Sequence, residues 1–213
     1  TRRSSDLSIV DDEVCREASK QEIIRRYFKT ACLVRQGLAS EAELQKIENL
    51  MRQLKLEPEN RPVVPAALKR AEATGQPAAA LELPDGTIVT GRTSELLGAS
   101  SALTLNALKM LAGIPHEVKL ISPTVIAPIQ TLKTDYMQSR NPRLHTDEML
   151  VALAISAATD ENAMRAMQKL DELSGCDLHS SVILGTVDDS VFKRLGINVT
   201  CEATYEDNNL YHK

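Results

Sequence analysis

Residues 11–74 carry a hydrophobic pattern typical of α-helices, with no alternating run that would indicate a strand. Apolar side chains recur at steps of three and four residues up to Gly37, which predicts a long first helix. Ser40 followed by Glu43 forms a capping box and predicts the start of a second helix. A short third helix is expected over residues 66–73. We therefore predict a helical subdomain over residues 1–76.

From residue 77 onward the pattern alternates between strands and helices. Strand-like runs at residues 79–83 and 87–90 flank a Pro-Asp-Gly sequence, which is typical of a tight turn, so a β-hairpin is expected. Residues 102–111 leave almost no polar face and predict a helix buried on most sides. Further strands are expected at residues 118–121, 179–184 and 197–201, and further helices at residues 126–137, 148–158, 160–173 and 188–195.

This order of elements predicts an α/β (α+β) fold in which residues 77–213 form a three-layer αβα sandwich with about five strands. The order also resembles the cytidine-deaminase-like layout, in which a hairpin leads into a buried helix whose first turn faces the active site. Zinc-dependent members of that group carry His-x-Glu or Cys-x-Glu there, and Pro-Cys-x-x-Cys at the next helix. Here residues 99–102 read Ala-Ser-Ser-Ala and residues 122–125 read Ser-Pro-Thr-Val, so the layout is expected without zinc chemistry.

Composition narrows the classes of function. Hydrophobic residues make up 43% of the 213 residues, which is enough for a sizeable core. The net charge of −4 and the aromatic content of 3% provide neither the basic field nor the stacking surface of a nucleic-acid binder. No run approaches the roughly 18 apolar residues of a membrane span, and the first residues lack an apolar signal core. We expect a cytoplasmic protein that binds neither nucleic acid nor membranes.

The four cysteines and four histidines are scattered along the chain. They form no Cys-x-x-Cys pair and no His-Glu-x-x-His element, which are spacings that would predict a metal site. We therefore expect reduced thiols and no bound metal.

The strongest candidate for chemistry is the glycine- and hydroxyl-rich stretch between the hairpin and the buried helix. Unpaired backbone N–H groups and the helix dipole favour anions at such an N-terminus, and an arginine nearby provides a clamp. The stretch matches no complete nucleotide-binding motif, and the alternative interpretation is that its serines only cap the helix. The predicted anion-binding residues are Gly91, Arg92, Thr93, Ser94, Ser100 and Ser101.

Two further residues are predicted to line a pocket. Asn141 lies shortly before a predicted helix and His179 begins a predicted strand, so either side chain could reach an end of the sheet. A lone histidine is more often a hydrogen-bonded structural residue than a catalyst, and that alternative stays open. Because no nucleophile motif accompanies them, a stand-alone hydrolase is not favoured and no catalytic residue is assigned.

Several stretches resemble a bacterial family: residues 13–27, 83–98, 100–109 and 179–184 look like the C-terminal half of domain-of-unknown-function family 1846. The resemblance runs from about residue 9 to the end. Members are longer, and their N-terminal half carries a Gly-Pro-Gly-Ser-Gly-Lys segment, similar to a phosphate-binding loop, that is absent here. The resemblance implies a fragment of a larger cytoplasmic protein, partnered by that missing half. It implies no activity and no catalytic residue.

Two functions therefore stay open. The first is a module that completes a nucleotide or phosphometabolite site together with the missing phosphate-loop half. The second is a structural module in which amphipathic helices within residues 11–55 pack against another subunit in a homo-oligomer. A polar pocket at residues 91–101 would favour the first, and an exposed apolar helix face would favour the second.

Overall fold

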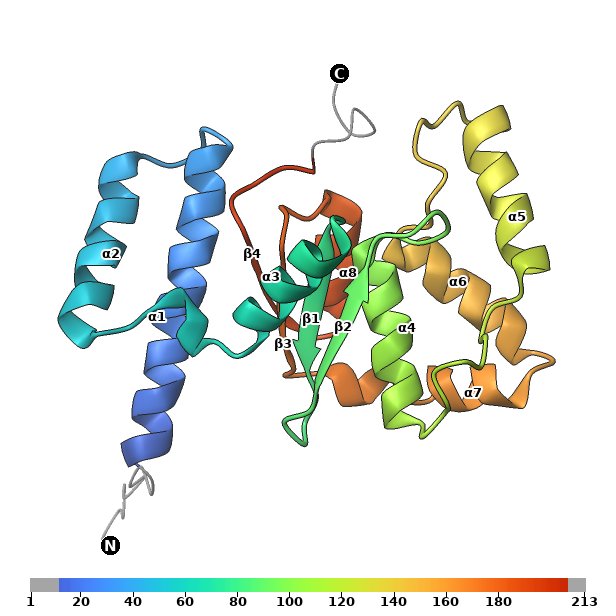
Figure 1. The fold of residues 1–213 in the computed structure, drawn as a ribbon, viewed down its shortest axis with the longest axis horizontal. Helices are drawn as coiled ribbons and strands as arrows, with labels where there is room; N and C mark the ends of the chain where they lie inside the picture. The colour runs from blue at the N-terminus through green and yellow to red at the C-terminus, as the bar shows by residue number, and fades with distance from the viewer. Residues whose placement is uncertain (1–11, 207–213) are drawn as a thin grey trace, which may run out of the picture.

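A computed structural model describes residues 12–206 of the chain, which form eight α-helices and one four-stranded sheet (Figure 1). The helices are α1 (Asp12–Arg35), α2 (Glu41–Leu54), α3 (Val63–Thr74), α4 (Ala99–Leu111), α5 (Pro123–Thr131), α6 (Thr146–Ala157), α7 (Glu161–Met167) and α8 (Thr186–Arg194). The strands are β1 (Ala78–Glu82), β2 (Ile88–Arg92), β3 (Asp177–Ser180) and β4 (Asn198–Cys201).

The sheet is mixed and has the strand order β2-β1-β3-β4. Strand β1 runs antiparallel to both β2 and β3, whereas β3 and β4 are parallel. This confirms a mixed α/β fold, but the expectation of about five strands is wrong for the described residues. Residues 118–121 form irregular turns instead of a strand, because the buried Leu120 and Ile121 fill the core without a neighbouring strand to pair with. The cytidine-deaminase-like layout stays a prediction.

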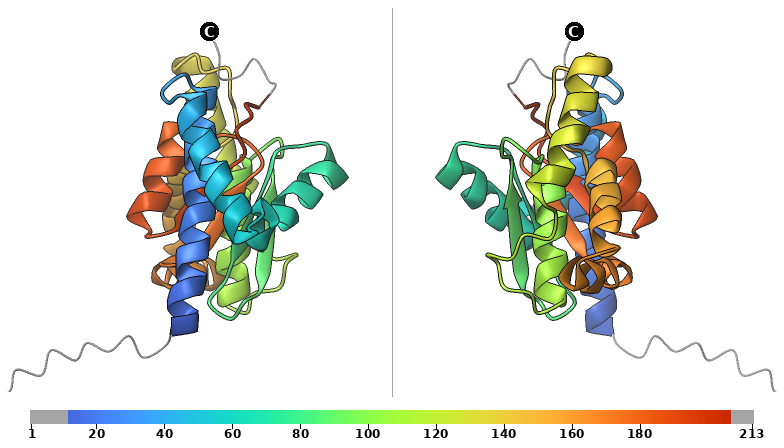
Figure 2. Two further views of the ribbon diagram at one scale, coloured as in Figure 1. Left: turned by 90° about the vertical axis from the view of Figure 1, so that its left-hand side faces the viewer. Right: turned by 90° about the vertical axis from the view of Figure 1, so that its right-hand side faces the viewer.

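Helices pack on both faces of this sheet (Figure 2). The central strand β1 lets helices on both sides approach the sheet closely, because its small alanine side chains alternate between the two faces. Ala80 packs against Val63 and Ala67 of α3, whereas Ala79 belongs to the larger core that includes Leu103 of α4. The largest core therefore lies between the sheet and the helices that follow β2 in the chain.

Helices α1 and α2 form a pair beside the sheet, at the left of Figure 1. The Ser40 hydroxyl accepts a hydrogen bond from the Glu43 amide, so the predicted start of α2 is confirmed. Ile24 and Phe28 of α1 and Met51 of α2 are buried within the chain's own fold, together with Val64 of α3. Because Ile24, Phe28 and Met51 are covered within the chain, they need no second subunit to bury them. Assembly into a homo-oligomer stays a prediction.

Several predicted elements have different bounds in the structure. Helix α5 begins at Pro123 and gives way after Thr131 to a π-helical turn, and residues 160–173 contain the short α7 followed by a 3₁₀ turn. Helix α3, which lies within the predicted N-terminal subdomain, packs on the sheet. The division of the chain at residue 76 stays a prediction.

Candidate functional site

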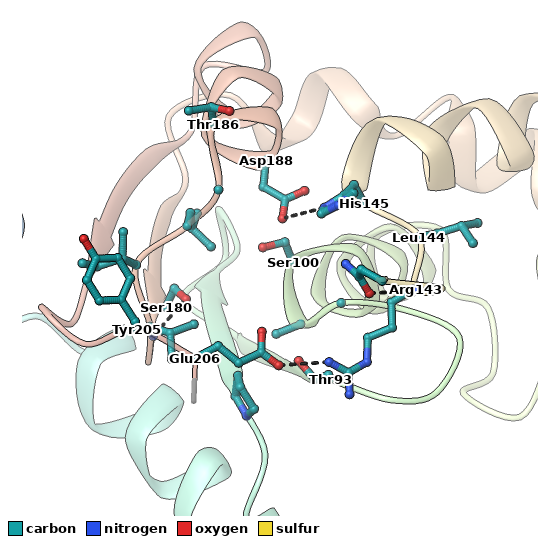
Figure 3. A pocket seen from close by; sticks show the side chains of 18 of the residues that line it. Thr93, Ser100, Arg143, Leu144, His145, Ser180, Thr186, Asp188, Tyr205 and Glu206 are labelled. Atoms are coloured by element: carbon teal, nitrogen blue, oxygen red, sulfur yellow. Dashed lines mark hydrogen bonds and ion pairs between the residues drawn. The ribbon is translucent and has the colours of Figure 1, made fainter. Parts of the chain in front are cut away.

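A cavity of about 320 Å³ lies where the N-termini of α4, α6 and α8 meet (Figure 3). The N-cap residues of these three helices, Gly98, His145 and Gly185, all line it. Ser180, the last residue of β3, and the residues after it form another part of the wall. Because the positive ends of three helix dipoles face one space, the cavity is suited to negative charge.

The three helix N-termini differ in whether their first backbone N–H groups already donate hydrogen bonds to other residues. Within the described chain, α4 and α8 begin at glycines without a side-chain cap, and the first-turn amides of Ala99 and Ser100 have no hydrogen-bond partner there. In α6, by contrast, the Thr146 amide donates to Asp188 over 2.8 Å, and the His145 amide donates to Glu148 over 2.8 Å. The open donors are therefore those of α4 and α8.

The prediction that Ser100 or Ser101 caps the buried helix is wrong, because its N-cap is Gly98. The two serines instead lie in the first turn and have different roles. The Ser101 hydroxyl donates to the carbonyl of Leu144 over 2.8 Å and so ties α4 to the chain before α6. The Ser100 side chain lines the cavity.

Two hydroxyl-bearing residues with little exposure, Ser100 and Thr93, line the cavity. Ser100 is 3% exposed and Thr93 is 2% exposed, and among the described residues neither hydroxyl makes a hydrogen bond. Figure 3 shows the Ser100 hydroxyl directed into the cavity. Both hydroxyls open onto the cavity, so they can donate to or accept from a group bound there.

Arg143 brings a positive charge to the cavity, and Glu206 pairs with it. Their side chains are 17% and 13% exposed, and one guanidinium nitrogen lies 2.9 Å from a Glu206 carboxylate oxygen. Lys133 donates to the carbonyl of Arg143 over 2.5 Å and pairs with Glu148 over 2.6 Å, which holds the loop before α6 in place.

His145 and Asp188 face each other across the cavity wall, with Nδ1 and a carboxylate oxygen 3.9 Å apart (Figure 3). The interaction with Asp188 raises the pKa of His145, although burial acts against the charged ring. Burial also opposes ionisation of Asp188, but interactions with His145 and Thr146 outweigh it and lower the pKa of that carboxyl. The pair therefore favours a cationic imidazole next to a carboxylate.

Three of the residues predicted from the sequence come together here: Thr93, Ser100 and Asn141 all line the cavity. Asn141 is 4% exposed, and its side-chain oxygen accepts the Arg143 amide over 3.1 Å, which shapes the loop that presents the arginine.

Four other predicted residues lie outside the lining. Arg92 is exposed and donates to the Thr93 carbonyl over 3.2 Å, and the Ser94 hydroxyl stabilises its own turn by accepting the amides of residues 96 and 97. Gly91 packs directly against α4, and Ser101 makes the bond to Leu144. These positions support the walls of the site without contacting the space inside.

His179 lies on the other face of β3 from Ser180 and is fully buried against α1. Its ring centroid is 4.7 Å from that of Phe28, and its two nitrogens face the Thr200 hydroxyl at 2.9 Å and Glu202 at 3.1 Å. Burial lowers the pKa of His179 despite the nearby carboxylate. In the structure this histidine joins the sheet to α1 and does not line the cavity.

Over residues 12–206, no three His, Cys, Asp or Glu side chains gather closely enough to hold a metal ion. All four cysteines are free thiols, and burial raises the pKa of Cys32 to about 11 and that of Cys201 to about 12. In the same described range, no helix has both the length and the apolar character needed to cross a bilayer.

Two family models match the chain. The C-terminal domain of unknown function DUF1846 matches residues 59–211, and the N-terminal domain of the same family matches residues 3–55. The chain belongs to the DUF1846 family. Relatives include UPF0371 proteins of Corynebacterium aurimucosum (54% identical over 206 residues, 96% of this chain) and Streptococcus thermophilus (52% over 207 residues, 97% of this chain).

These matches correct the expectation that only the C-terminal half of the family is present, because the segment containing α1 and α2 matches the N-terminal family model. They also begin at residue 3, within the stretch thought to lie outside the resemblance. The chain spans 41% of the length of the Corynebacterium relative and 42% of the length of the Streptococcus relative.

The site residues predicted from the sequence do not include the charged groups of the DUF1846 cavity, which are Arg143, His145, Asp188 and Glu206. A local signal existed for two of them, since Arg143 and His145 immediately precede a strongly apolar helix. No local signal identified Asp188 or Glu206, because each reaches its partner only through the folding of distant segments.

Proposed function

We propose that this DUF1846 cavity binds a small phosphorylated metabolite, with the phosphate at the N-termini of α4 and α8. The observation that carries the proposal is the Ser100 hydroxyl, which belongs to a nearly buried residue, makes no hydrogen bond among the described residues and points into the cavity beside the uncapped start of α4 (Figure 3). A phosphate has several acceptor oxygens, so one group can take hydrogen bonds from backbone amides and hydroxyls together.

The charges of the cavity support the same ligand class. Arg143 and His145 provide positive charge, while the two carboxylates in the wall are already engaged. Asp188 accepts the first amide of α6 and faces His145, and Glu206 is paired with Arg143. The groups still able to donate are the first-turn amides of α4 and α8 and the hydroxyls of Ser100 and Thr93, which suits an anion.

The size and the walls limit the rest of the ligand. A cavity of about 320 Å³ lies at the lower end of the range for small-molecule sites. Its apolar wall contains Pro77, Leu144, Val182, Ile183 and Leu184. A phosphorylated sugar or a mononucleotide suits such a space better than a dinucleotide. For a nucleotide, we propose that part of the longer DUF1846 protein outside this chain supplies additional contacts.

Two adjacent serines test the proposal. Ser100→Ala removes a hydroxyl that has no partner within the described chain, so we expect little loss of stability but about tenfold weaker phosphate binding. Ser101→Ala removes the buried hydrogen bond to Leu144, so we expect a loss of about 1 to 2 kcal/mol in unfolding free energy with phosphate affinity unchanged.

Calorimetric titration with inorganic phosphate, sugar phosphates and nucleoside monophosphates measures the affinities, with the unphosphorylated compounds as controls. Denaturant unfolding of both variants measures stability. The proposal fails when neither phosphate nor any phosphorylated compound binds the parent protein, or when Ser100→Ala binds them as tightly as the parent does.

The affinity of the cavity for an anion is expected to depend on pH through His145. Asp188 raises the pKa of His145, the charges of Lys133 and Glu148 act on the ring in opposite directions, and the charged Arg143 lines the same space. At pH values below the raised pKa of His145, the charged imidazolium helps to hold an anion. This contribution is lost as the pH rises through that pKa.

Sulfate is the suitable probe because its charge stays constant over this range. We expect sulfate affinity to fall about tenfold, or ~1.4 kcal/mol, between pH 6 and pH 9. His145→Asn retains a good N-cap residue for α6 but removes the titrating ring, so its affinity should be nearly independent of pH. A steep pH dependence in His145→Asn would show that another group is responsible.

A further inference from the structure

We infer that Glu206 is an internal competitor for the anion site, occupying Arg143 until the anionic group of a ligand displaces it. This inference rests on the proposed function and adds a mode of regulation to the same site. Before a ligand binds, the Glu206 carboxylate occupies the place beside Arg143 that an oxyanion of the bound ligand takes.

Glu206 belongs to a short strap, residues 204–206, that follows β4 and whose last two residues line the cavity (Figure 3). Thr204 anchors the strap, since its carbonyl accepts the Ile183 amide over 2.8 Å and its hydroxyl donates to the Ser181 carbonyl over 3.1 Å. Beyond this anchor, Arg35 of α1 lies over the ring of Tyr205, with 5.7 Å from the guanidinium carbon to the ring centroid.

The strap also forms a wall between two spaces. Tyr205 and Glu206 line both the cavity and a second hollow of about 400 Å³, which extends toward the C-terminal end of α3. Pro77 and Val182 are common to both linings as well. Release of Glu206 from Arg143 would therefore join two adjacent spaces and admit a larger ligand than the closed cavity does.

The burial of the ion pair determines what can replace Glu206. Both side chains are more than four-fifths buried, so removing the carboxylate alone would leave the Arg143 guanidinium without a counter-charge in a poorly solvated place. A ligand with its own anionic group restores that counter-charge, whereas a neutral ligand of the same shape does not. The pair therefore selects for anions and keeps the cavity closed to neutral metabolites.

The test compares phosphate affinity in the parent protein, Glu206→Gln and a control, Glu95→Gln. Glu206→Gln removes the competing charge while keeping the shape of the side chain, so inorganic phosphate should bind about tenfold more tightly. Glu95 is exposed and lies outside the cavity lining, so Glu95→Gln makes the same change of net charge and should leave the affinity within about twofold of the parent.

The same pair of measurements in an Arg143→Gln background identifies the mechanism. Competition for Arg143 predicts that Glu206→Gln no longer improves binding once the arginine is gone, whereas a general charge effect would persist. Thermal unfolding of each variant verifies that the fold is retained. Equal phosphate affinities in the parent protein and in Glu206→Gln overturn this inference alone, and so does an improvement that persists without Arg143. Absence of phosphate binding in both parent and Glu206→Gln overturns the proposed function and this inference together.

Discussion

Arg61→Ala is expected to lower the free energy of unfolding by about 3 to 5 kcal/mol, the usual cost of removing one partner from a buried ion pair. Arg61 is fully buried, and its guanidinium lies 2.7 Å from a carboxylate oxygen of Asp177 in β3. It also donates to the Asn198 carbonyl over 2.7 Å and to the Thr200 hydroxyl over 3.2 Å, both in β4. One side chain from the segment before α3 thus binds the parallel strand pair together.

Urea unfolding of Arg61→Ala and of Arg70→Ala measures this contribution. Arg70 is an exposed arginine on the adjacent α3, so its replacement controls for the loss of a positive charge and should change stability by less than about 0.5 kcal/mol. Equal stability losses in the two variants would contradict a structural role for the buried ion pair.

The helical part of the fold was predictable because its signals are local. Ser40 and Glu43 mark the start of α2 through a bond between residues three apart, and the apolar stripe of α1 coincides with its buried face at Ile24 and Phe28. The expected strand at residues 118–121 failed because an apolar run of four residues reports burial but does not identify a pairing partner.

The candidate site was predictable only in part, since it depends on contacts between distant segments. Thr93 and Ser100 are predictable because they flank a buried helix, a feature that the local sequence pattern indicates without the tertiary structure. The pair formed by Arg143 and Glu206 joins residues 63 positions apart, which no local pattern reports. For His179, the sequence indicates the strand but not which face of the sheet each side chain takes. Side chains alternate along β3, and Ser180 is the one that reaches the cavity.

Gly91→Ala is expected to destabilise the protein by about 3 kcal/mol, at the upper end of the range for overpacking a core. Gly91 lies opposite Ala79 in the β1–β2 pair, on the face that α4 covers. A Cβ atom at this position would lie 2.5 Å from the Cα of Leu103 and closer still to its backbone nitrogen. Because the obstacle is the backbone of α4, no side-chain rotation relieves the clash, and the helix must move away from the sheet.

Gly98→Ala provides the matched control and separates packing from ligand binding in this glycine-rich stretch. Gly98 has a φ of −65°, which alanine adopts readily, and its Cβ would lie 3.8 Å from the Leu144 carbonyl oxygen. Unfolding measurements should therefore show a loss below about 1 kcal/mol for Gly98→Ala, mainly from a poorer N-cap residue. Because Gly98 lines the cavity and Gly91 does not, Gly98→Ala is the variant expected to alter phosphate affinity. A stable Gly91→Ala protein would show that β2 and α4 are not packed as closely as the structure indicates.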